Sequence, residues 1–166
     1  ALGLGALDVT ERYEQSEATY TFAAHAAHVA VDPDTGGIEI LSYATVEDFG
    51  RCVNPMTVHG QAIGGAVQGI GGAFLEEFSY GAEGQPLSAT FADYLLPAAT
   101  DVPAIRSVAL ENTPSKTNPL GFKGAGEGAI VAPGAVIANA VSDALSSYGI
   151  EITELPMSPT NLRRLI

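Results

Sequence analysis

The sequence is poor in basic residues and in cysteine. Only 7 of its 166 residues are Lys or Arg, against 19 Asp or Glu, which gives a formal net charge of −12. Because nucleic acids and anionic membrane surfaces bind clustered Lys and Arg, this charge balance argues against both as partners. The single cysteine, Cys52, excludes an internal disulfide and a cysteine-rich metal site. It favours a cytoplasmic location, and a small buried hydrophobe is its simplest interpretation.

Long apolar runs and targeting signals are also missing from the sequence. No run approaches the roughly 18 residues of a membrane span, so we expect no membrane insertion. The N-terminus lacks the basic, apolar and cleavage regions of a signal peptide. The chain begins at Ala1 without an initiator Met, and we therefore expect a fragment, a processed chain or a split subunit. Its length fits a single domain over residues 1–166, with an irregular segment over residues 1–19.

Glycine and proline, by contrast, are abundant, at 19 and 10 residues. Two β-compatible runs, residues 20–31 ("YTFAAHAAHVAV") and residues 38–50 ("IEILSYATVEDFG"), flank the turn sequence "DPDTGG" (residues 32–37). This pattern predicts a β-hairpin. His25 and His28 would lie on opposite faces of the first strand, so they are not expected to chelate a metal together.

Residues 57–80 ("TVHGQAIGGAVQGIGGAFLEEFSY") show helical spacing of apolar residues. The predicted stripe is Ile63, Val67, Ile70, Phe74 and Phe78. The same segment contains six glycines: Gly60, Gly64, Gly65, Gly69, Gly71 and Gly72. Each costs about 1 kcal/mol relative to Ala in a helix interior. We therefore expect another backbone or a bulky ligand to approach this helix closely.

The remaining elements complete an α+β fold. Residues 80–94 predict a turn leading into a short strand, and residues 104–112 ("AIRSVALEN") predict another strand. Pro133 suits the first turn of a helix, and a last short helix would follow Ser158 as N-cap. The expected buried stripe of the helix after Pro133 is Ile137, Val141, Ala144 and Tyr148. The result is a mixed sheet with a hairpin, packed by the glycine-rich helix and a second C-terminal helix.

A glycine-rich loop, residues 117–134 ("TNPLGFKGAGEGAIVAPG"), surrounds one acid, Glu127. A carboxylate just before a helix can act as a general base if a proton lies within reach. Two alternatives compete with this interpretation. The loop could be a connector with an exposed acid, or "GAGEGA" could be a dinucleotide fingerprint, although Pro119 does not suit the strand that should precede one. Gln61, at the start of the glycine-rich helix, could bind a polar cofactor edge or simply face solvent.

Three segments together resemble one family. "VEDFGRCVNP", "HGQAIGGAVQGIGGAFLEE" and "TNPLGFKGAGEGAIVAPGAVIANAVSDAL" are similar, in order and spacing, to the C-terminal part of a molybdopterin-binding subunit. The subunit is that of the xanthine dehydrogenase, aldehyde oxidase and aerobic carbon monoxide dehydrogenase family. The resemblance runs from about Thr21 to the end of the chain. After Glu127 the chain has Gly128-Ala129, where eukaryotic members tend to have Pro-Pro.

The resemblance implies roles for particular residues. Glu127 matches the acid of the "GxGE" motif, which lies beside molybdenum and acts as general base in the hydroxylation of an electron-poor carbon by water. Gln61 matches the Gln that hydrogen-bonds the pterin cofactor. Gly60, Gly124 and Gly126 would allow close approach to that cofactor. No metal-ligating side chain is expected.

The resemblance also implies an assembly. The cofactor would be a molybdopterin-type molybdenum cofactor, in the cytosine dinucleotide form if the motifs are bacterial. The partners would be the remainder of the molybdenum subunit, an iron–sulfur subunit, a FAD subunit and a small-molecule substrate such as an N-heterocycle or an aldehyde. The isolated chain is expected to be inactive. A non-catalytic structural or interaction domain of the same fold, within a multi-subunit assembly, is the alternative function.

Overall fold

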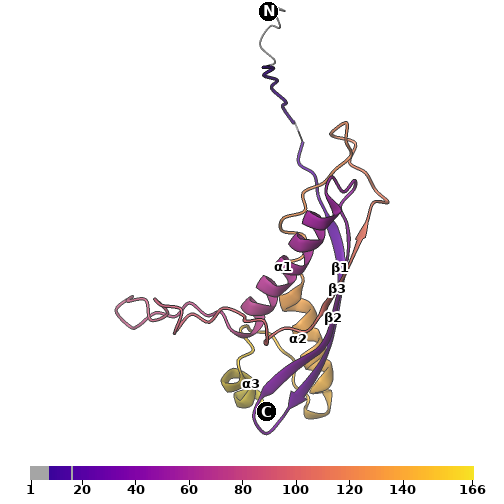
Figure 1. Ribbon diagram of the computed structural model, residues 1–166. Helices are drawn as coiled ribbons and strands as arrows, with labels where there is room; N and C mark the ends of the chain where they lie inside the picture. Colours follow the sequence, from indigo (N-terminus) through magenta and orange to yellow (C-terminus); the bar gives the residue numbers. More distant parts are fainter. Residues whose placement is uncertain (1–7, 16) are drawn as a thin grey trace, which may run out of the picture.

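The structure, a computed structural model, describes residues 8–15 and 17–166. Within these residues the elements are β1 (Phe22–Asp32), β2 (Gly37–Asp48), α1 (Pro55–Phe74), β3 (Ile105–Leu110), α2 (Pro133–Ala144), the 3-10 turn η1 (Ser146–Tyr148) and α3 (Pro159–Leu165). The strands form one mixed sheet in the order β1-β2-β3, with β1 antiparallel and β3 parallel to β2. Helices α1 and α2 lie on the same face of this sheet (Figure 1). The α+β fold with a mixed sheet is confirmed. Of the segment expected to be irregular, residues 1–7 and 16 lie outside the described residues.

The hairpin forms as expected, but a bulge changes which side chains of β2 face the helices. His28 pairs with Ser42 and Val29 pairs with Ile40, so Leu41 is an extra residue in β2. An extra residue reverses the in-and-out alternation of the strand beyond it. Before the bulge the inward-facing residues of β2 are the partly buried Ile38 and Ile40, whereas after it they are the fully buried Tyr43, Thr45 and Glu47. The bulge therefore brings a polar side chain and a carboxyl into the interior.

Helix α1 starts earlier and ends earlier than predicted. The Asn54 side chain accepts hydrogen bonds from the N–H groups of Met56 and Thr57, at 3.1 and 3.3 Å, so the helix begins at Pro55. It ends at Phe74, and Phe78 is 53% exposed, which corrects the predicted stripe. The buried face is formed largely by small residues: Ala62, Ala66, Ile70, Gly71 and Ala73. Such a face lets neighbouring backbone approach the helix closely.

Helices α2 and α3 form as predicted, but the buried stripe of α2 differs from the predicted one. Pro133 opens α2, and Ile137 and Val141 are fully buried. Ala144 and Tyr148 are exposed instead of buried, because the helix gives way to η1 and Leu145 takes the buried position. Ser158 caps α3, since its hydroxyl accepts from the Asn161 N–H at 3.2 Å.

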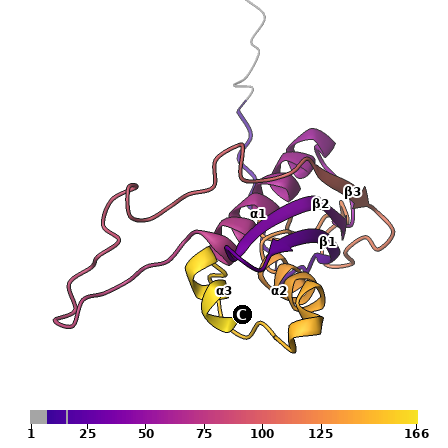
Figure 2. The same cartoon turned by 90° about the horizontal axis from the view of Figure 1, so that it is seen from below.

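A long loop, residues 75–104, projects away from the body of the molecule between α1 and β3 (Figures 1 and 2). The strand expected within residues 80–94 does not form there; an isolated bridge joins Tyr80 to Pro86. A strand needs a partner, and residues 80–94 lie beyond the edge of the sheet. Tyr94 instead ties the loop back to the end of α1, since its hydroxyl donates to Glu76 Oε2 at 2.6 Å.

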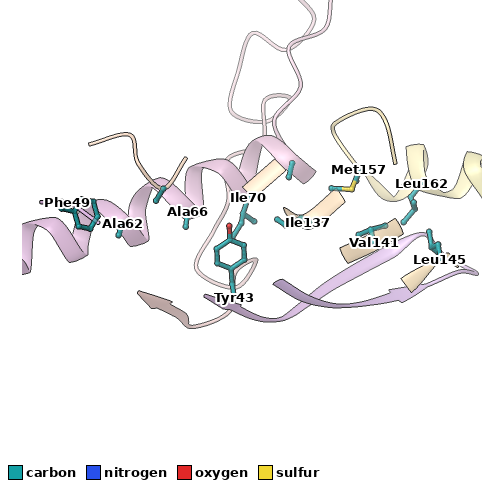
Figure 3. Close-up of a cluster of buried hydrophobic side chains, with 12 residues drawn as sticks. Tyr43, Phe49, Ala62, Ala66, Ile70, Ile137, Val141, Leu145, Met157 and Leu162 are labelled. Carbon is teal, nitrogen blue, oxygen red and sulfur yellow. The ribbon is translucent and has the colours of Figure 1, made fainter. Parts of the chain in front are cut away.

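The hydrophobic core lies between the sheet and the helices. Tyr43 rises from β2 toward Ile70 of α1, while Ile137 and Val141 of α2 and Leu162 of α3 close the other end (Figure 3). Within the described residues, no helix has the length and apolar character needed to cross a membrane. The core fixes α1 and α2 on the sheet. The loop that contains Glu127 directly precedes α2.

Candidate functional site

The site is built on the Glu127 loop, defined here as residues 118–132, which leads into α2. Glu127 itself is exposed, and its carbonyl oxygen accepts a hydrogen bond from the Ile130 N–H at 3.3 Å in a turn. The start of the loop is held by the segment that precedes β1. Thr21 Oγ1 donates to the Gly124 carbonyl, and the Gly124 N–H donates to Thr19 Oγ1 at 3.1 Å. The carboxylate therefore sits on a turn whose N-terminal side is held by hydrogen bonds between two threonine side chains and the Gly124 backbone.

The loop runs along one stripe of α1 formed by Gln61, Gly65 and Gly69. A β-carbon placed on Gly65 would lie 3.1 Å from the β-carbon of Ala129. One placed on Gly69 would lie 2.5 Å from Cγ of Pro133. Residues four apart share a helix face, so these glycines form a groove that the loop fills. This close approach of backbone is what the glycine-rich helix sequence predicted.

Gln61 is the N-terminal residue of the same stripe and lies beside Gly126. A β-carbon on Gly126 would be 3.7 Å from Gln61 Nε2, and the Gln61 side chain is otherwise exposed. The structure therefore brings together two residues that are 65 positions apart in sequence, and Glu127 is the next residue along the loop. The exposed Gln61 amide offers donors and an acceptor to a polar ligand, and the exposed Glu127 carboxylate offers further acceptors.

The other glycines predicted to approach a cofactor face open space. A β-carbon on Gly60 or Gly124 would meet no other atom of the described residues within 4 Å, and the same holds for Gly64, for which no such role was predicted. Gly65 and Gly69 face the loop, whereas Gly60 and Gly64 lie on a part of α1 that the described chain leaves uncovered. Helix glycines that pack against nothing still cost helix stability. An uncovered, side-chain-free surface beside Gln61 fits the approach of a large, flat cofactor.

A buried ion pair anchors the loop to the end of β2. The Lys123 ammonium lies 3.3 Å from Asp48 Oδ1, and the two side chains are 8% and 3% exposed. Asp48 also accepts hydrogen bonds from the backbone N–H groups of Gly50 at 2.9 Å and of Asn112 and Thr113 at 3.1 Å. Burial alone would raise the pKa of Asp48, but these donors and the Lys123 charge outweigh burial and lower the pKa to about 2.

Sequence reasoning missed a second carboxyl at this site, Glu47. Its side chain is 1% exposed, and its Oε1 accepts a hydrogen bond from Thr45 Oγ1 at 3.1 Å. Thr45 Oγ1 also lies 3.1 Å from His25 Nε2, and His25 Nδ1 lies 2.8 Å from the Tyr43 hydroxyl. Because the Thr45 hydroxyl donates to Glu47, His25 Nε2 must donate to Thr45 and His25 Nδ1 must accept from Tyr43. Burial lowers the pKa of His25, which agrees with this neutral form.

The remaining candidates do not gather at the site. His28 is exposed on the far face of β1, and Cys52 is partly buried, with its N–H donating to Glu111 Oε1 at 2.6 Å. Across residues 8–15 and 17–166, no group of three or more His, Cys, Asp and Glu side chains could hold a metal ion. The dinucleotide fingerprint lacks its structural context, because residues 118–123 form an isolated bridge at Phe122 rather than a strand leading into the loop.

Comparison with known proteins agrees with this geometry. Residues 4–103 match the molybdopterin cofactor-binding domain family. The chain is 43% identical over 150 residues to subunit gamma of the 6-hydroxypseudooxynicotine dehydrogenase complex of Paenarthrobacter nicotinovorans. It is 36% identical over 158 residues to the nicotine 6-hydroxylase large subunit of the same organism. These alignments cover 90% and 95% of this chain but 19% of each relative, so the chain spans about a fifth of their length.

Solved structures show the same fold. A Cu,Mo-CO dehydrogenase matches with a TM-score of 0.86 and 31% identity over 92% of this chain and 19% of that chain. The quinoline 2-oxidoreductase of Pseudomonas putida 86 matches with a TM-score of 0.81 and 42% identity, over 85% of this chain and 18% of that chain. The chain therefore belongs to the molybdopterin cofactor-binding domain family found in the large subunits of these oxidoreductases. The resemblance drawn from its three motifs is confirmed.

Proposed function

We propose that this chain supplies the catalytic base of a molybdenum hydroxylase. One observation carries the proposal. Glu127 is exposed on a turn between Gly126, which lies beside Gln61, and Gly128, and the uncovered Gly60 directly precedes Gln61 in α1. When bound, the molybdenum cofactor would supply the redox chemistry of hydroxylation with water as the oxygen source. The polypeptide has to hold that cofactor, orient it and accept a proton.

Each residue of the site has a distinct part in this function. The Glu127 carboxylate would accept the proton that is released as water is converted into the attacking nucleophile. The Gln61 amide would hydrogen-bond the pterin, and Gly60, Gly124 and Gly126 would let the cofactor reach the backbone without meeting a side chain. A positioned general base contributes typically 10²–10⁴-fold to the rate. The general base makes its full contribution to the rate only if the loop holds the carboxylate in position.

The relatives support a substrate class and an assembly. Two of the matched proteins that are more than 35% identical are named for nicotine and quinoline, both N-heterocycles, whereas the aldehyde oxidoreductase subunit PaoC of Escherichia coli matches at 32%. We therefore favour an N-heterocycle over an aldehyde as the substrate. The proposal includes the cytosine dinucleotide form of the cofactor, an iron–sulfur partner and a FAD partner, and a cytoplasmic enzyme. The remainder of the molybdenum subunit would cover the open side of α1.

The test is a Glu127→Gln substitution in the complete enzyme that contains this chain. The amide keeps the shape of the side chain but cannot accept the proton, so turnover should fall by about 10²–10⁴-fold while molybdenum and pterin content stay unchanged. Glu151→Gln, at another exposed acid, is the matched control and should leave turnover unchanged. Full activity in the Glu127→Gln enzyme would reject the assigned role and favour a structural domain.

A further inference from the structure

Glu47 is a buried carboxyl that the proposed mechanism does not use. Its Oε2 is sealed from solvent and has no hydrogen-bond partner among the described residues. A buried polar atom without a hydrogen-bond partner lowers stability, so the presence of this carboxyl is not explained by its contribution to folding. The salt bridges of the described residues do not include Glu47 either, and Lys123 pairs instead with Asp48, the residue that follows Glu47.

The sealed oxygen is in contact with the Glu127 loop. A β-carbon placed on Gly128 would lie 2.6 Å from Glu47 Oε2 and 3.0 Å from Thr21 Cγ2. A side-chain carbon at position 128 therefore cannot coexist with the carboxyl of Glu47 in its present position. Gly128 directly follows Glu127, so any movement forced on Gly128 is passed to the base within one residue.

The Glu127 loop lies against α1 at positions 126 and 129 and against Glu47 of β2 at position 128. A β-carbon on Gly126 would lie 3.7 Å from Gln61 Nε2, and one on Gly65 would lie 3.1 Å from the Ala129 β-carbon, so α1 lies against the loop at both positions. Between these positions Gly128 faces Glu47 of β2. Residues 126–129 therefore lie between two elements, α1 and β2. Glu127 is the residue of this segment that has its side chain exposed.

We propose that Glu47 is the positioning residue of the Glu127 loop: its buried side chain supports Gly128 and thereby sets where the Glu127 carboxylate lies. This inference rests on the proposed function of Glu127. The contact between Glu47 and Gly128 can nevertheless be measured without measuring turnover. The hydrogen-bond chain from Tyr43 through His25 and Thr45 ends on Glu47 Oε1, so it holds the support in one orientation.

The pKa of Glu47 reflects its burial. Burial raises the pKa of Glu47, and the hydrogen bond from Thr45 only partly offsets that rise. The titratable groups that face Glu47 are Tyr43 on β2, whose pKa is raised by burial and by the neighbouring Glu47, and His25 on β1, whose pKa is lowered by burial.

The decisive experiment is a double-mutant cycle in the complete, cofactor-loaded enzyme, using Gly128→Ala and Glu47→Asp. Gly128→Ala alone should collide with Glu47 and lower kcat on the order of 10–100-fold, with KM and molybdenum content retained, because a small displacement of a catalytic group has effects of this size. Glu47→Asp withdraws the carboxyl from Gly128 and should also lower kcat. In the Glu47→Asp background, Gly128→Ala should lower kcat by a smaller factor than it does alone, because the shorter side chain relieves the collision.

The unfolding temperature supplies a readout that does not depend on turnover. It should show the same coupling between positions 47 and 128 with and without cofactor. Glu47→Gln keeps the shape and length of the side chain and should retain kcat. In this variant the unfolding temperature should no longer fall as the pH rises above the ordinary Glu value of 4.5, because a raised folded-state pKa loses stability in that window.

Two results would overturn the inference. One is a Glu47→Asp enzyme with unchanged kcat per molybdenum. The other is a Gly128→Ala effect of the same size in the presence and absence of Glu47→Asp. If the cycle shows coupling in unfolding temperature but Glu127→Gln stays active, the proposed function fails while the contact stands. If Glu127→Gln is inactive and the cycle shows no coupling, the inference fails alone.

Discussion

The Lys123 ammonium and the Asp48 carboxylate form a buried ion pair, 3.3 Å apart, that joins the Glu127 loop to the end of β2. The same ammonium donates to Thr113 Oγ1 at 2.6 Å and lies 4.2 Å from the ring centroid of Phe22. Three segments that are distant in sequence therefore meet at one cation. The loop that presents Glu127 begins from this fixed point.

Removing the cation should destabilise the protein strongly. Lys123→Met leaves a nearly inaccessible Asp48 charge without its partner, which typically costs about 3–5 kcal/mol. Lys116→Met, at an exposed lysine two positions before the loop, is the matched control and should change stability by no more than about 0.5 kcal/mol. Chemical unfolding of the full-length subunit measures both. Equal effects of the two substitutions would show that the ion pair contributes nothing.

Asp48 should also dominate part of the acid unfolding of this region. Its pKa is lowered from the ordinary 3.8 to about 2, so between these values the unfolded state binds more protons than the folded state. The stability that the Asp48 charge contributes is therefore complete above pH 3.8 and is lost as the pH falls toward 2. Asp48→Asn should be less stable at neutral pH but should lose less stability over this range. Parallel stability curves for the two proteins would contradict the assignment.

The two classes of glycine in α1 should respond oppositely to alanine. Gly69→Ala forces a β-carbon to within 2.5 Å of Pro133 and 3.0 Å of the Ile130 carbonyl oxygen, and overpacking of this kind costs about 1–3 kcal/mol. Gly72→Ala, on the same helix, meets no atom of the described residues within 4 Å. In the cofactor-free subunit it should be neutral or stabilising by up to about 1 kcal/mol. Thermal unfolding compares them directly, and a Gly69→Ala protein as stable as the Gly72→Ala protein would mean that the loop does not pack as described.

Gln61 should affect cofactor retention more than folding. Gln61→Ala removes the exposed amide beside Gly126, so we expect lower pterin occupancy in the purified enzyme with little change in unfolding temperature. Gln68→Ala is the matched control, because Gln68 is also exposed on α1 but does not belong to the Gln61, Gly65 and Gly69 stripe. Molybdenum and pterin analysis checks both. Unchanged occupancy in Gln61→Ala would leave Gln61 as an ordinary surface residue.

Local sequence signals predicted the elements that depend on local chemistry. The turn "DPDTGG" places the hairpin, Pro133 opens α2, and Ser158 caps α3, because each acts on backbone within a few residues of itself. The strand expected within residues 80–94 failed for the opposite reason. Its composition permits an extended chain, but a strand forms only against a partner, and the sequence does not show that this segment projects away from the sheet.

The candidate site divides in the same way. The sequence alone singled out Glu127 and Gln61 as candidates, because both stand among glycines that indicate close approach, and the family resemblance supplied their proposed roles. Only the tertiary structure decided the role open to Glu47. Regular alternation from Ile38 and Ile40 would send Val46 into the interior and Glu47 to the surface, but the extra residue Leu41 reverses the faces. A bulge is a property of how two strands pair, so the burial of this carboxyl under Gly128 cannot be read from either strand by itself.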